Sequence, residues 1–477
     1  MAAHYGLAGS PPLHVRRADP TDHLLVVIAI GCGVIAVVEG MGVRVVVVLG
    51  VVSTLAMIAR RTGVPPLRWL ALGVSLLVVV GVHARHQDAH ALPDVGPYSG
   101  WVTVVDDPQP FGSSARAVLS IEGRRYEMWA RGNAARRRVT QWDAGDMVMV
   151  AGLRVALSDD RRDRVAWQHV VGAFESDWLG DRRVGSPVAR ASNRVRGLVG
   201  AASSAFAAPD NTLFTGLVIG DDRDQPPEML NRFRRTGLSH LTAVSGQNVA
   251  LVLAAASPIL RCVSGRLRTA MTLGLILWFV VITRLEPSIL RAGVMAALAV
   301  IARAGGREAA PMRMLALAVC VLLVIDPVLA SSVGFQLSVG ATAGVIAIGP
   351  RLTRSLRRLG VFAAPLGITL GAQLGVLLPS ALVFGRLPVT GVGANLLAVP
   401  VAGLVMFLGL PLSILAGVAE PLRPLLMFPM RIGVRWVDTV ALLADRVEPR
   451  DPAFGWWVHG AVAVVALVCA WGRRLRR

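Results

Sequence analysis

The sequence predicts a polytopic α-helical membrane protein, with about 10–12 transmembrane helices and a small extracytoplasmic OB-like β domain. Three observations predict this fold class. The 477 residues are 54% hydrophobic and only 17% charged, and the mean hydropathy is +0.58. Apolar runs of bilayer-spanning length recur along the chain, and one long polar stretch interrupts them. A soluble nucleic-acid-binding protein of this size would carry far more charge, so the net charge of +19 does not by itself indicate that class.

About twelve runs have the length and hydropathy of membrane spans. Three lie near the N-terminus, at about 24–38, 43–59 and 67–82. Nine follow the polar stretch, at about 237–260, 269–283, 288–304, 312–330, 333–348, 362–384, 389–418, 425–443 and 455–471. The run at 425–443 contains Arg431, Arg435 and Asp438, so it also fits a helix that lies along the membrane interface.

Arginines predict the orientation, since the chain has no lysine and short cytoplasmic loops collect basic residues. With a cytoplasmic N-terminus, most arginines of the short loops fall inside. The outer loops hold Arg44, Arg284, Arg386, Arg446 and Arg450. This bias places both termini inside and the long polar stretch outside, so topology explains most of the net charge.

The outer stretch has short alternating segments such as "WVTVVDD" and "RAVLSIEG", separated by turn residues, which is typical of a small β barrel. Its aromatic residues are Trp101, Phe111, Tyr126, Trp129, Trp142 and Trp167. They either stack nucleobases, as in OB folds that hold single strands, or form barrel core and membrane anchors. The run Arg136, Arg137 and Arg138 fits a phosphate contact and a solvated loop equally well. The predicted regions are an N-terminal membrane region (1–84), the β domain (85–185), an amphipathic connection (186–236) and a polytopic membrane domain (237–477).

Polar residues within the apolar runs gather in four stretches, where they either line a polar path or form hydrogen bonds between helices. The stretches are "LSHLTAVSGQNV", "EPSILRAGVMA", "SSVGFQLSVGA" and the pair "GAQLGVLLPS" and "GANLLAVP". In the first, Ser245-Gly246 predicts a helix broken at membrane depth, which is tolerated where it lines a cavity. The second buries Arg291 one helical turn after Pro287-Ser288.

These stretches resemble the ComEC family of competence proteins, the inner-membrane channels for DNA uptake. The family's "GLxHLxAxSGxxV", "PSxxRAxxM", "P…GFQLS" and "AQ…LP…F…NLLAVP" segments recur here in order over roughly 205–410, preceded by a "GD" element within "GDDRD". Asn248 stands where many members have His. Many members also continue into a metallo-β-lactamase-like domain. This chain contains no HxHxDH sequence and ends at "GRRLRR", so the resemblance implies no nuclease activity, and we expect no enzyme and no cofactor.

The resemblance implies a channel that passes single-stranded DNA into the cytoplasm during natural transformation. The candidates for lining its path are His240, Ser245, Gln247, Asn248, Ser288, Arg291, Gln336, Ser338, Gln373 and Asn395. The candidates for contacting DNA at the entrance are Arg232, Arg234, Arg235, Trp101 and Trp129. Expected partners are single-stranded DNA, the lipid bilayer, a DNA receptor protein outside, a DNA-translocating or DNA-binding protein inside, and a second copy of the chain. The alternative is a transporter of another solute or envelope precursor, or a membrane scaffold without a DNA role.

Three other patterns fit both a functional and an ordinary structural explanation. His83, His86, Asp88 and His90 have a spacing that permits a zinc or copper site, but a polar helix end explains them as well. His240 and Ser245 do not have the spacing of a nucleophile and its base on one helical turn, which argues against a hydrolase. The acidic residues Asp221, Asp222 and Asp224 fit a cation site, a helix cap or repulsion of DNA. No cysteine pair has zinc spacing, and we expect no disulfide.

Overall fold

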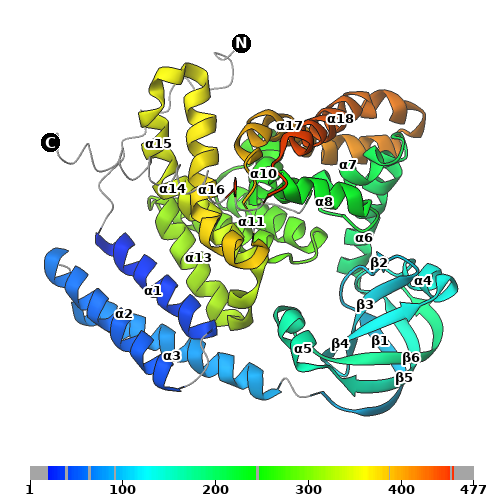
Figure 1. The fold of residues 1–477 in the computed structure, drawn as a ribbon, viewed down its shortest axis with the longest axis horizontal. Coiled ribbons are helices and arrows are strands. Elements are labelled where there is room, and N and C mark those ends of the chain that lie inside the picture. Colours follow the sequence, from blue (N-terminus) through cyan, green and yellow to red (C-terminus); the bar gives the residue numbers. More distant parts are fainter. Residues whose placement is uncertain are drawn as a thin grey trace.

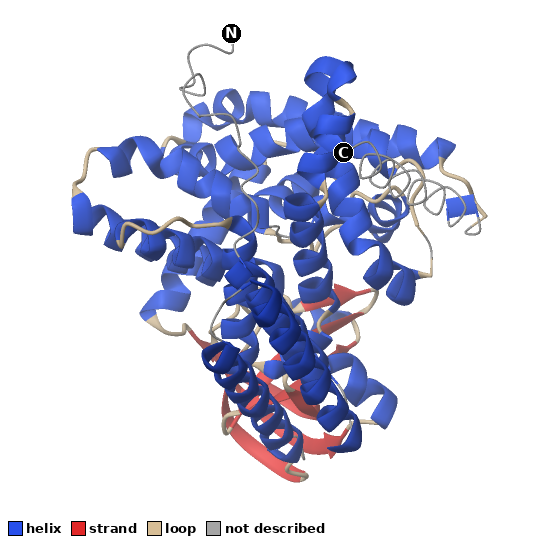
Figure 2. Cartoon of the chain, turned by 90° about the vertical axis from the view of Figure 1, so that its left-hand side faces the viewer, coloured by secondary structure: helices blue, strands red, loops and turns tan. Residues whose placement is uncertain are grey.

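The structure is a computed structural model that describes residues 20–37, 41–62, 66–90, 93–242, 246–385, 387–451 and 454–455. At 20, 41–45, 59–62, 66–68, 70 and 85–90 it describes the backbone alone. The described chain consists of a large helical part and one β barrel, and the barrel lies at one end of the molecule (Figures 1 and 2).

The N-terminal region is formed by α1 (Pro20–Val37), α2 (Met41–Thr62) and α3 (Pro66–His90). These helices pack on one another, and α1 also packs on α13 (Pro311–Ile325), which comes much later in the chain. Leu24, Ile28 and Leu323 are fully buried in the shared core. Arg313 donates to the Asp22 carboxylate at 2.6 Å beside this core. The first three apolar runs therefore form helices that are fixed to the later helical part.

The barrel contains β1 (Gly96–Val104), β2 (Gln109–Phe111), β3 (Ser114–Ile121), β4 (Arg124–Arg131), β5 (Met147–Ala156) and β6 (Val170–Arg183). Neighbouring strands pair in the order β1-β5-β6-β4-β3-β2, and a further β1–β3 pairing closes the sheet. The β4–β6 pair is parallel and the others are antiparallel. A short helix, α4 (Asn133–Val139), follows β4, and α5 (Asp159–Val165) precedes β6. Because side chains alternate along a strand, Leu119, Tyr126 and Phe174 point inward and form the core with their neighbours.

The remaining chain is helical. Its elements are α6 (Pro187–Ser203), α7 (Asp210–Ile219), α8 (Pro227–Arg235), α9 (Ser239–Thr242), α10 (Gly246–Arg261), α11 (Gly265–Ile282), α12 (Pro287–Ala304), α13, η2 (Pro327–Ser331), α14 (Val333–Ala347), α15 (Gly349–Ser355), η3 (Arg357–Phe362), α16 (Ala363–Phe384), α17 (Gly391–Val418), η4 (Glu420–Leu422) and α18 (Arg423–Val447). Each predicted run up to 425–443 coincides with a helix or a pair of helices. The run at 455–471 lies almost entirely outside the described residues.

Among the described residues, four helices are long and apolar enough to cross a membrane, and a bent pair, α14 with α15, would make a fifth. Four further apolar helices are shorter, including Thr21–Val37 and Pro311–Ile325. A helix of 15 residues such as α13 rises only about 22 Å, which is less than the hydrocarbon thickness. The described chain therefore has several candidate spans, and the number of about twelve crossings stays a prediction.

Two of the apolar helices, α14 and α16, approach each other through glycines. A Cβ atom on Gly344 would lie 2.0 Å from the Gly371 carbonyl oxygen, and one on Gly375 would lie 2.1 Å from the Gly340 oxygen. Glycines four residues apart on facing helices allow the two backbones to touch, as in the small-residue packing of membrane helices. Figure 1 shows these two helices side by side.

The charged helix α18 packs along α17 and presents two different sides. Val434, Val437 and Ala441 are buried in the core that α17 and α18 share with α6 and α7. On another side, Asp438 accepts from Arg232 of α8, and Arg435 donates to Asp210 of α7 at 3.0 Å. The charges within the run at 425–443 therefore attach α18 to the preceding helices.

Candidate functional site

The four polar stretches lie on five helices that contact one another in a ring. α10 packs on α12, α12 on α14, α14 on α16, α16 on α17, and α17 packs back on α10. α10 begins at Gly246, and the chain break predicted at Ser245-Gly246 falls on a stretch, 243–245, that lies outside the described residues. Stretches that are up to about 150 residues apart in sequence are therefore neighbours, which packing of the apolar helix faces makes possible.

Arg291 lies at the junction of three ring helices. Its side chain starts on α12 and is buried, with 5% of the residue exposed. Nε donates to Ser338 Oγ of α14 at 2.9 Å, and Nη1 lies 3.7 Å from Met295 Sδ. A Cβ atom on Gly246 would lie only 2.5 Å from Nη2, so glycine at the start of α10 makes room for the guanidinium group. Among the described residues, no carboxylate lies within ion-pair distance of Arg291.

The other predicted path residues make local contacts on the same ring. Gln336 donates to the Ala330 carbonyl at 2.8 Å, and Asn395 donates to the Gly391 carbonyl at 2.7 Å. Asn395 Oδ1 is buried and has no hydrogen-bond partner among the described residues. Gln373 Nε2 lies 3.1 Å from the Cβ position of the same Gly391, so Gln373 of α16 lies beside the first residue of α17.

Residues of the stretch "LSHLTAVSGQNV" contact two neighbouring helices, α7 and α17. Asn248 is buried and donates to the Leu217 carbonyl of α7 at 3.4 Å, whereas Gln247 is exposed and lies beside Gly403 of α17. His240 lies in the short helix α9 with an exposed side chain, and Ser288 lies in the first turn of α12. Ser245 lies outside the described residues. Their role in a path stays a prediction.

The arginines proposed for the entrance lie on or near α8, and two of them are paired. Arg232 donates to Asp438 at 2.5 Å, and Arg235 makes a two-pronged contact with Asp445 at 2.6 and 2.7 Å. Arg234 is exposed and contacts Asn231 at 3.3 Å. Arg232 and Arg235 therefore hold α8 against α18, and Arg234 is the member of the trio whose charge faces solvent.

The barrel carries a cleft of about 300 Å³ between the segment that joins β1 to β3 and the segment that joins β5 to β6. The cleft is lined by Phe111, Arg116, Trp129, Arg161, Arg164, Val165, Trp167 and Gln168. The rings of Phe111 and Trp129 are 5.4 Å apart, and the Arg161 guanidinium lies 5.9 Å from the Trp129 ring. Aromatic faces beside guanidinium groups can bind a planar base and a phosphate.

A buried carboxylate positions the cations of this cleft. Glu127 accepts from Arg116 at 3.0 Å and from Arg161 at 2.7 and 2.8 Å. Burial alone would raise the pKa of Glu127, but the hydrogen bonds from Arg161 and Arg116 outweigh it and lower that pKa. Glu127 therefore stays ionised and holds both guanidinium groups at the cleft wall.

Most of the predicted aromatic residues of the barrel lie in one of two locations, the core or the cleft. Tyr126 and Trp142 are buried in the barrel core, which is the structural role predicted as the alternative to base stacking. Trp129, Phe111 and Trp167 line the cleft. Trp101 is not among the lining residues; it lies on β1 with the Arg183 guanidinium 4.1 Å from its ring. Among the three arginines of α4, Arg138 donates to the Gly180 carbonyl at 2.9 Å.

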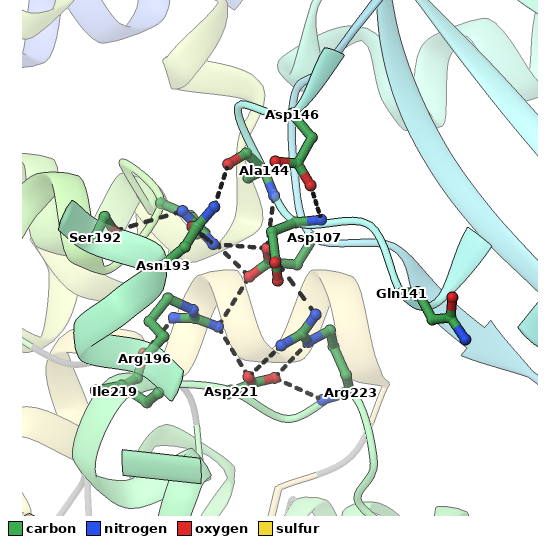
Figure 3. Close-up of polar contacts among 12 residues, drawn as sticks. Asp107, Gln141, Ala144, Asp146, Ser192, Asn193, Arg196, Ile219, Asp221 and Arg223 are labelled. Carbon is green, nitrogen blue, oxygen red and sulfur yellow. Dashed lines mark hydrogen bonds and ion pairs between the residues drawn. The ribbon is translucent and has the colours of Figure 1, made fainter. Parts of the chain in front are cut away.

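A cluster of charged side chains joins the barrel to the helices (Figure 3). Asp107, which follows β1, accepts from Arg284 at 2.7 and 3.0 Å and pairs with Arg196 of α6 at 2.9 Å. Arg196 also pairs with Asp221 at 3.0 Å, and Asp221 accepts from Arg223 at 2.6 Å. Burial by itself would raise the pKa of Asp107, but the three guanidinium groups lower it below its ordinary value. We name this cluster of Asp107, Arg196, Asp221, Arg223 and Arg284 the charged junction.

The charged junction was not predicted from the sequence, apart from the acidic character of "GDDRD". Asp221 contributes a carboxylate to this cluster, and Asp107, Arg196 and Arg284 come from three other segments. Arg284 and the residue after it have positive φ angles of 60° and 57°, a conformation that is unfavourable for non-glycine residues. Contacts with Asp107 and Asn193 hold Arg284 in that turn.

Within the described residues, no group of three His, Cys, Asp or Glu side chains could hold a metal ion. His83 contacts the Val324 carbonyl at 2.9 Å, and the side chains of His86, Asp88 and His90 are outside the description. Cys32 and Cys320 are both buried and free.

The ring of helices, the candidate spans and the appended barrel define a helical protein with several candidate membrane spans and one β domain. Residues 217–475 match the family model described as "Competence protein", which covers more than half of the chain. The chain therefore belongs to the competence protein family, as its motifs predicted, and this membership indicates a role in competence, the uptake of DNA. No curated protein and no solved structure matches the chain.

Proposed function

We propose that this chain is a membrane channel that passes single-stranded DNA into the cytoplasm during natural transformation. The observation that carries the proposal is Arg291, a buried guanidinium group on a ring of candidate membrane helices with no carboxylate partner among the described residues. An arginine within a membrane helix costs free energy, about 2.5–3.5 kcal/mol or more at the helix centre and less near its ends, so such residues usually serve a function. A DNA phosphate supplies the missing anion, and guanidinium binds phosphate with two parallel hydrogen bonds.

The barrel supports the same proposal as a receiving surface. Apart from the short β2, the closed sheet has five strands with one parallel pair and a helix, α4, after the third of them, which fits an OB fold. The cleft lies on strands β3 and β4 and between the flanking loops, where OB folds bind oligonucleotides. Trp129 and Phe111 provide stacking surfaces, and Arg164 provides a cation.

The arginine bias of the loops supports an orientation with the barrel outside the bacterial inner membrane and both termini in the cytoplasm. In this orientation a DNA receptor protein delivers the strand to the barrel, and a DNA-translocating or DNA-binding protein receives it inside. The chain itself is proposed to transport DNA without cleaving it and without a cofactor.

Uptake of labelled single-stranded DNA into proteoliposomes tests the proposal. Arg291→Ala is expected to reduce uptake at least about ten-fold, because one lost charge-assisted contact is worth more than about 1.4 kcal/mol. Arg291→Lys, which keeps the charge but not the two-pronged geometry, should retain part of the uptake. The matched control is Arg313→Ala, since Arg313 lies on a neighbouring helix but has Asp22 as its partner. Normal uptake by Arg291→Ala, with equal insertion of all variants, would contradict the proposed path.

The alternative of a membrane scaffold or a transporter of another solute is favoured by one observation. Gln336 and Asn395 donate to carbonyl groups of their own or adjoining helices, as residues do when they only assemble a bundle. The same proteoliposomes decide between the two: a scaffold or a transporter of another solute takes up no labelled DNA in its wild-type form.

A further inference from the structure

The barrel cleft is attached to the helical part at both of its rims, and the two attachments differ in kind. One rim is the segment between β1 and β3, which contributes Phe111 to the cleft and Asp107 to the charged junction. The other is the segment between β5 and β6, which contributes the residues from Arg161 to Gln168. Any ligand in the cleft therefore lies between two points that contact the helices.

The first rim is firmly fixed. The Asp107 side chain is 6% exposed and has three guanidinium groups around it, and its Oδ1 also accepts from the Ala144 backbone at 2.9 Å. Removing one member of such a buried set leaves uncompensated charge, so this rim resists displacement.

The second rim has a much weaker attachment. His169 follows directly after the cleft residue Gln168, and its Nε2 lies 2.8 Å from Asp326 Oδ2. The two side chains are 34% and 20% exposed, so solvent screens this pair more strongly than the buried contacts of Asp107. Gln168 itself accepts from Arg116 at 2.6 Å through its side chain and from Arg125 at 3.0 Å through its carbonyl group.

Asp326 is connected to Arg291 through η2 and α14. Its other oxygen accepts from the Val328 backbone at 3.1 Å and so begins the short helix η2. Gln336 of α14 donates to Ala330 in η2, and Ser338, two residues further on, accepts from Arg291. Hydrogen bonds, the short helix η2 and the first turns of α14 thus connect the second rim of the cleft with the buried guanidinium group.

We propose that the His169–Asp326 contact is a latch through which occupancy of the cleft is transmitted to η2, α14 and Arg291. This proposal rests on the proposed function, because the occupant is a single-stranded nucleic acid. A phosphate in the cleft competes for Arg116 and releases Gln168, and the adjoining His169 then leaves Asp326. The first rim stays fixed on the charged junction, so the movement is confined to the second rim, and His169 and Asp326 act as positioning residues.

Two substitutions of His169 separate the latch from general stability. His169 has a left-handed backbone with a φ of 58°, which asparagine tolerates. His169→Asn therefore keeps the turn but is too short to reach Asp326, whereas His169→Gln places an amide nitrogen near the position of Nε2. Asparagine should remove the latch, and glutamine should restore it.

The experiment measures hydrogen exchange of residues 327–336 in the full chain in nanodiscs, with and without an oligodeoxythymidylate of about ten nucleotides. In the wild-type protein, DNA should accelerate this exchange by about three-fold or more. In His169→Asn, exchange should already be fast without DNA and should not respond to it, and His169→Gln should regain the response. DNA binding and uptake without any change at 327–336 would overturn the latch and leave the proposed function intact. Absence of DNA binding to the wild-type protein would overturn both.

Discussion

Replacing Asp107 by asparagine is expected to open the contact between the barrel and the helices. Asparagine has nearly the same shape and keeps an oxygen for the Ala144 amide, but it removes the charge that faces Arg196 and Arg284 at 2.7 to 3.0 Å. The guanidinium groups would then remain in a buried place with Asp221 as their remaining carboxylate in the charged junction.

The size of the effect follows from the burial of this contact. Breaking a buried ion pair by removing one partner costs about 3–5 kcal/mol. A loss of about 3 kcal/mol corresponds to roughly a hundred-fold increase in the equilibrium constant for opening. The matched control is Asp94→Asn in the same domain, because Asp94 and Arg124 form a pair at 3.3 Å with side chains that are 51% and 36% exposed. Such exposed pairs contribute about 0–1 kcal/mol.

Hydrogen exchange of the Ala144 amide, which donates to Asp107, reports this opening directly. In Asp107→Asn the exchange rate should rise by about two orders of magnitude, and in Asp94→Asn by less than about five-fold. An increase below about ten-fold in Asp107→Asn would refute the argument that burial makes this contact strong.

Two further substitutions test packing and protonation. Gly344→Ala places a Cβ atom 2.0 Å from the Gly371 carbonyl oxygen, so it should force α14 and α16 apart. The expected cost is about 1–3 kcal/mol of stability, seen as a lower thermal midpoint of unfolding. The control Gly274→Ala, which has open space at its Cβ position, should leave the midpoint unchanged. Part of the Glu286 residue remains exposed. Loss of water around its carboxyl group, and then the negative charges of Asp106 and Asp222, raise its pKa from 4.5 to about 7. Since its protonated form is favoured in the fold, the stability it contributes below pH 4.5 should be lost as the pH rises through about 7. In Glu286→Gln the thermal midpoint should no longer fall as the pH rises over that range. A pH dependence equal to that of the wild-type protein would contradict the raised pKa of Glu286.

Local sequence signals predicted much of the fold because hydropathy acts within single segments. The burial of Arg291 followed from its position inside an apolar run. The barrel strands were predicted from alternation, and β1 to β6 occupy Gly96–Arg183, within the predicted domain at 85–185. The sequence did not separate the aromatic residues of the cleft from the other aromatic residues. Trp101 and Trp129 both stand in predicted strands, but they lie at different places on the barrel.

Contacts over long sequence separations were not predictable in the same way. Asp107 and Arg284 are 177 residues apart, and His169 and Asp326 are 157 apart. Asp107 and His169 stand in the outer polar stretch, whereas Asp326 stands inside the apolar run at 312–330. Opposite charges occur throughout the chain, so neither setting indicates a partner. Only the folded arrangement selects which of them meet.

The sequence by itself determined that apolar helices dominate, that a β barrel is inserted after the third helix, and that the family motifs lie on helices. These properties depend on neighbouring residues, because hydropathy and alternation are read within one segment. The tertiary structure decided that five separate helices contact one another in a ring and that three of them meet at Arg291. It also decided that buried charge fixes one rim of the barrel cleft, whereas the other rim is joined to η2 by the partly exposed His169–Asp326 pair and by the packing of 166–168. The physical reason is that the strength of a charged contact depends on burial and on its partners, and both are set only when distant segments pack.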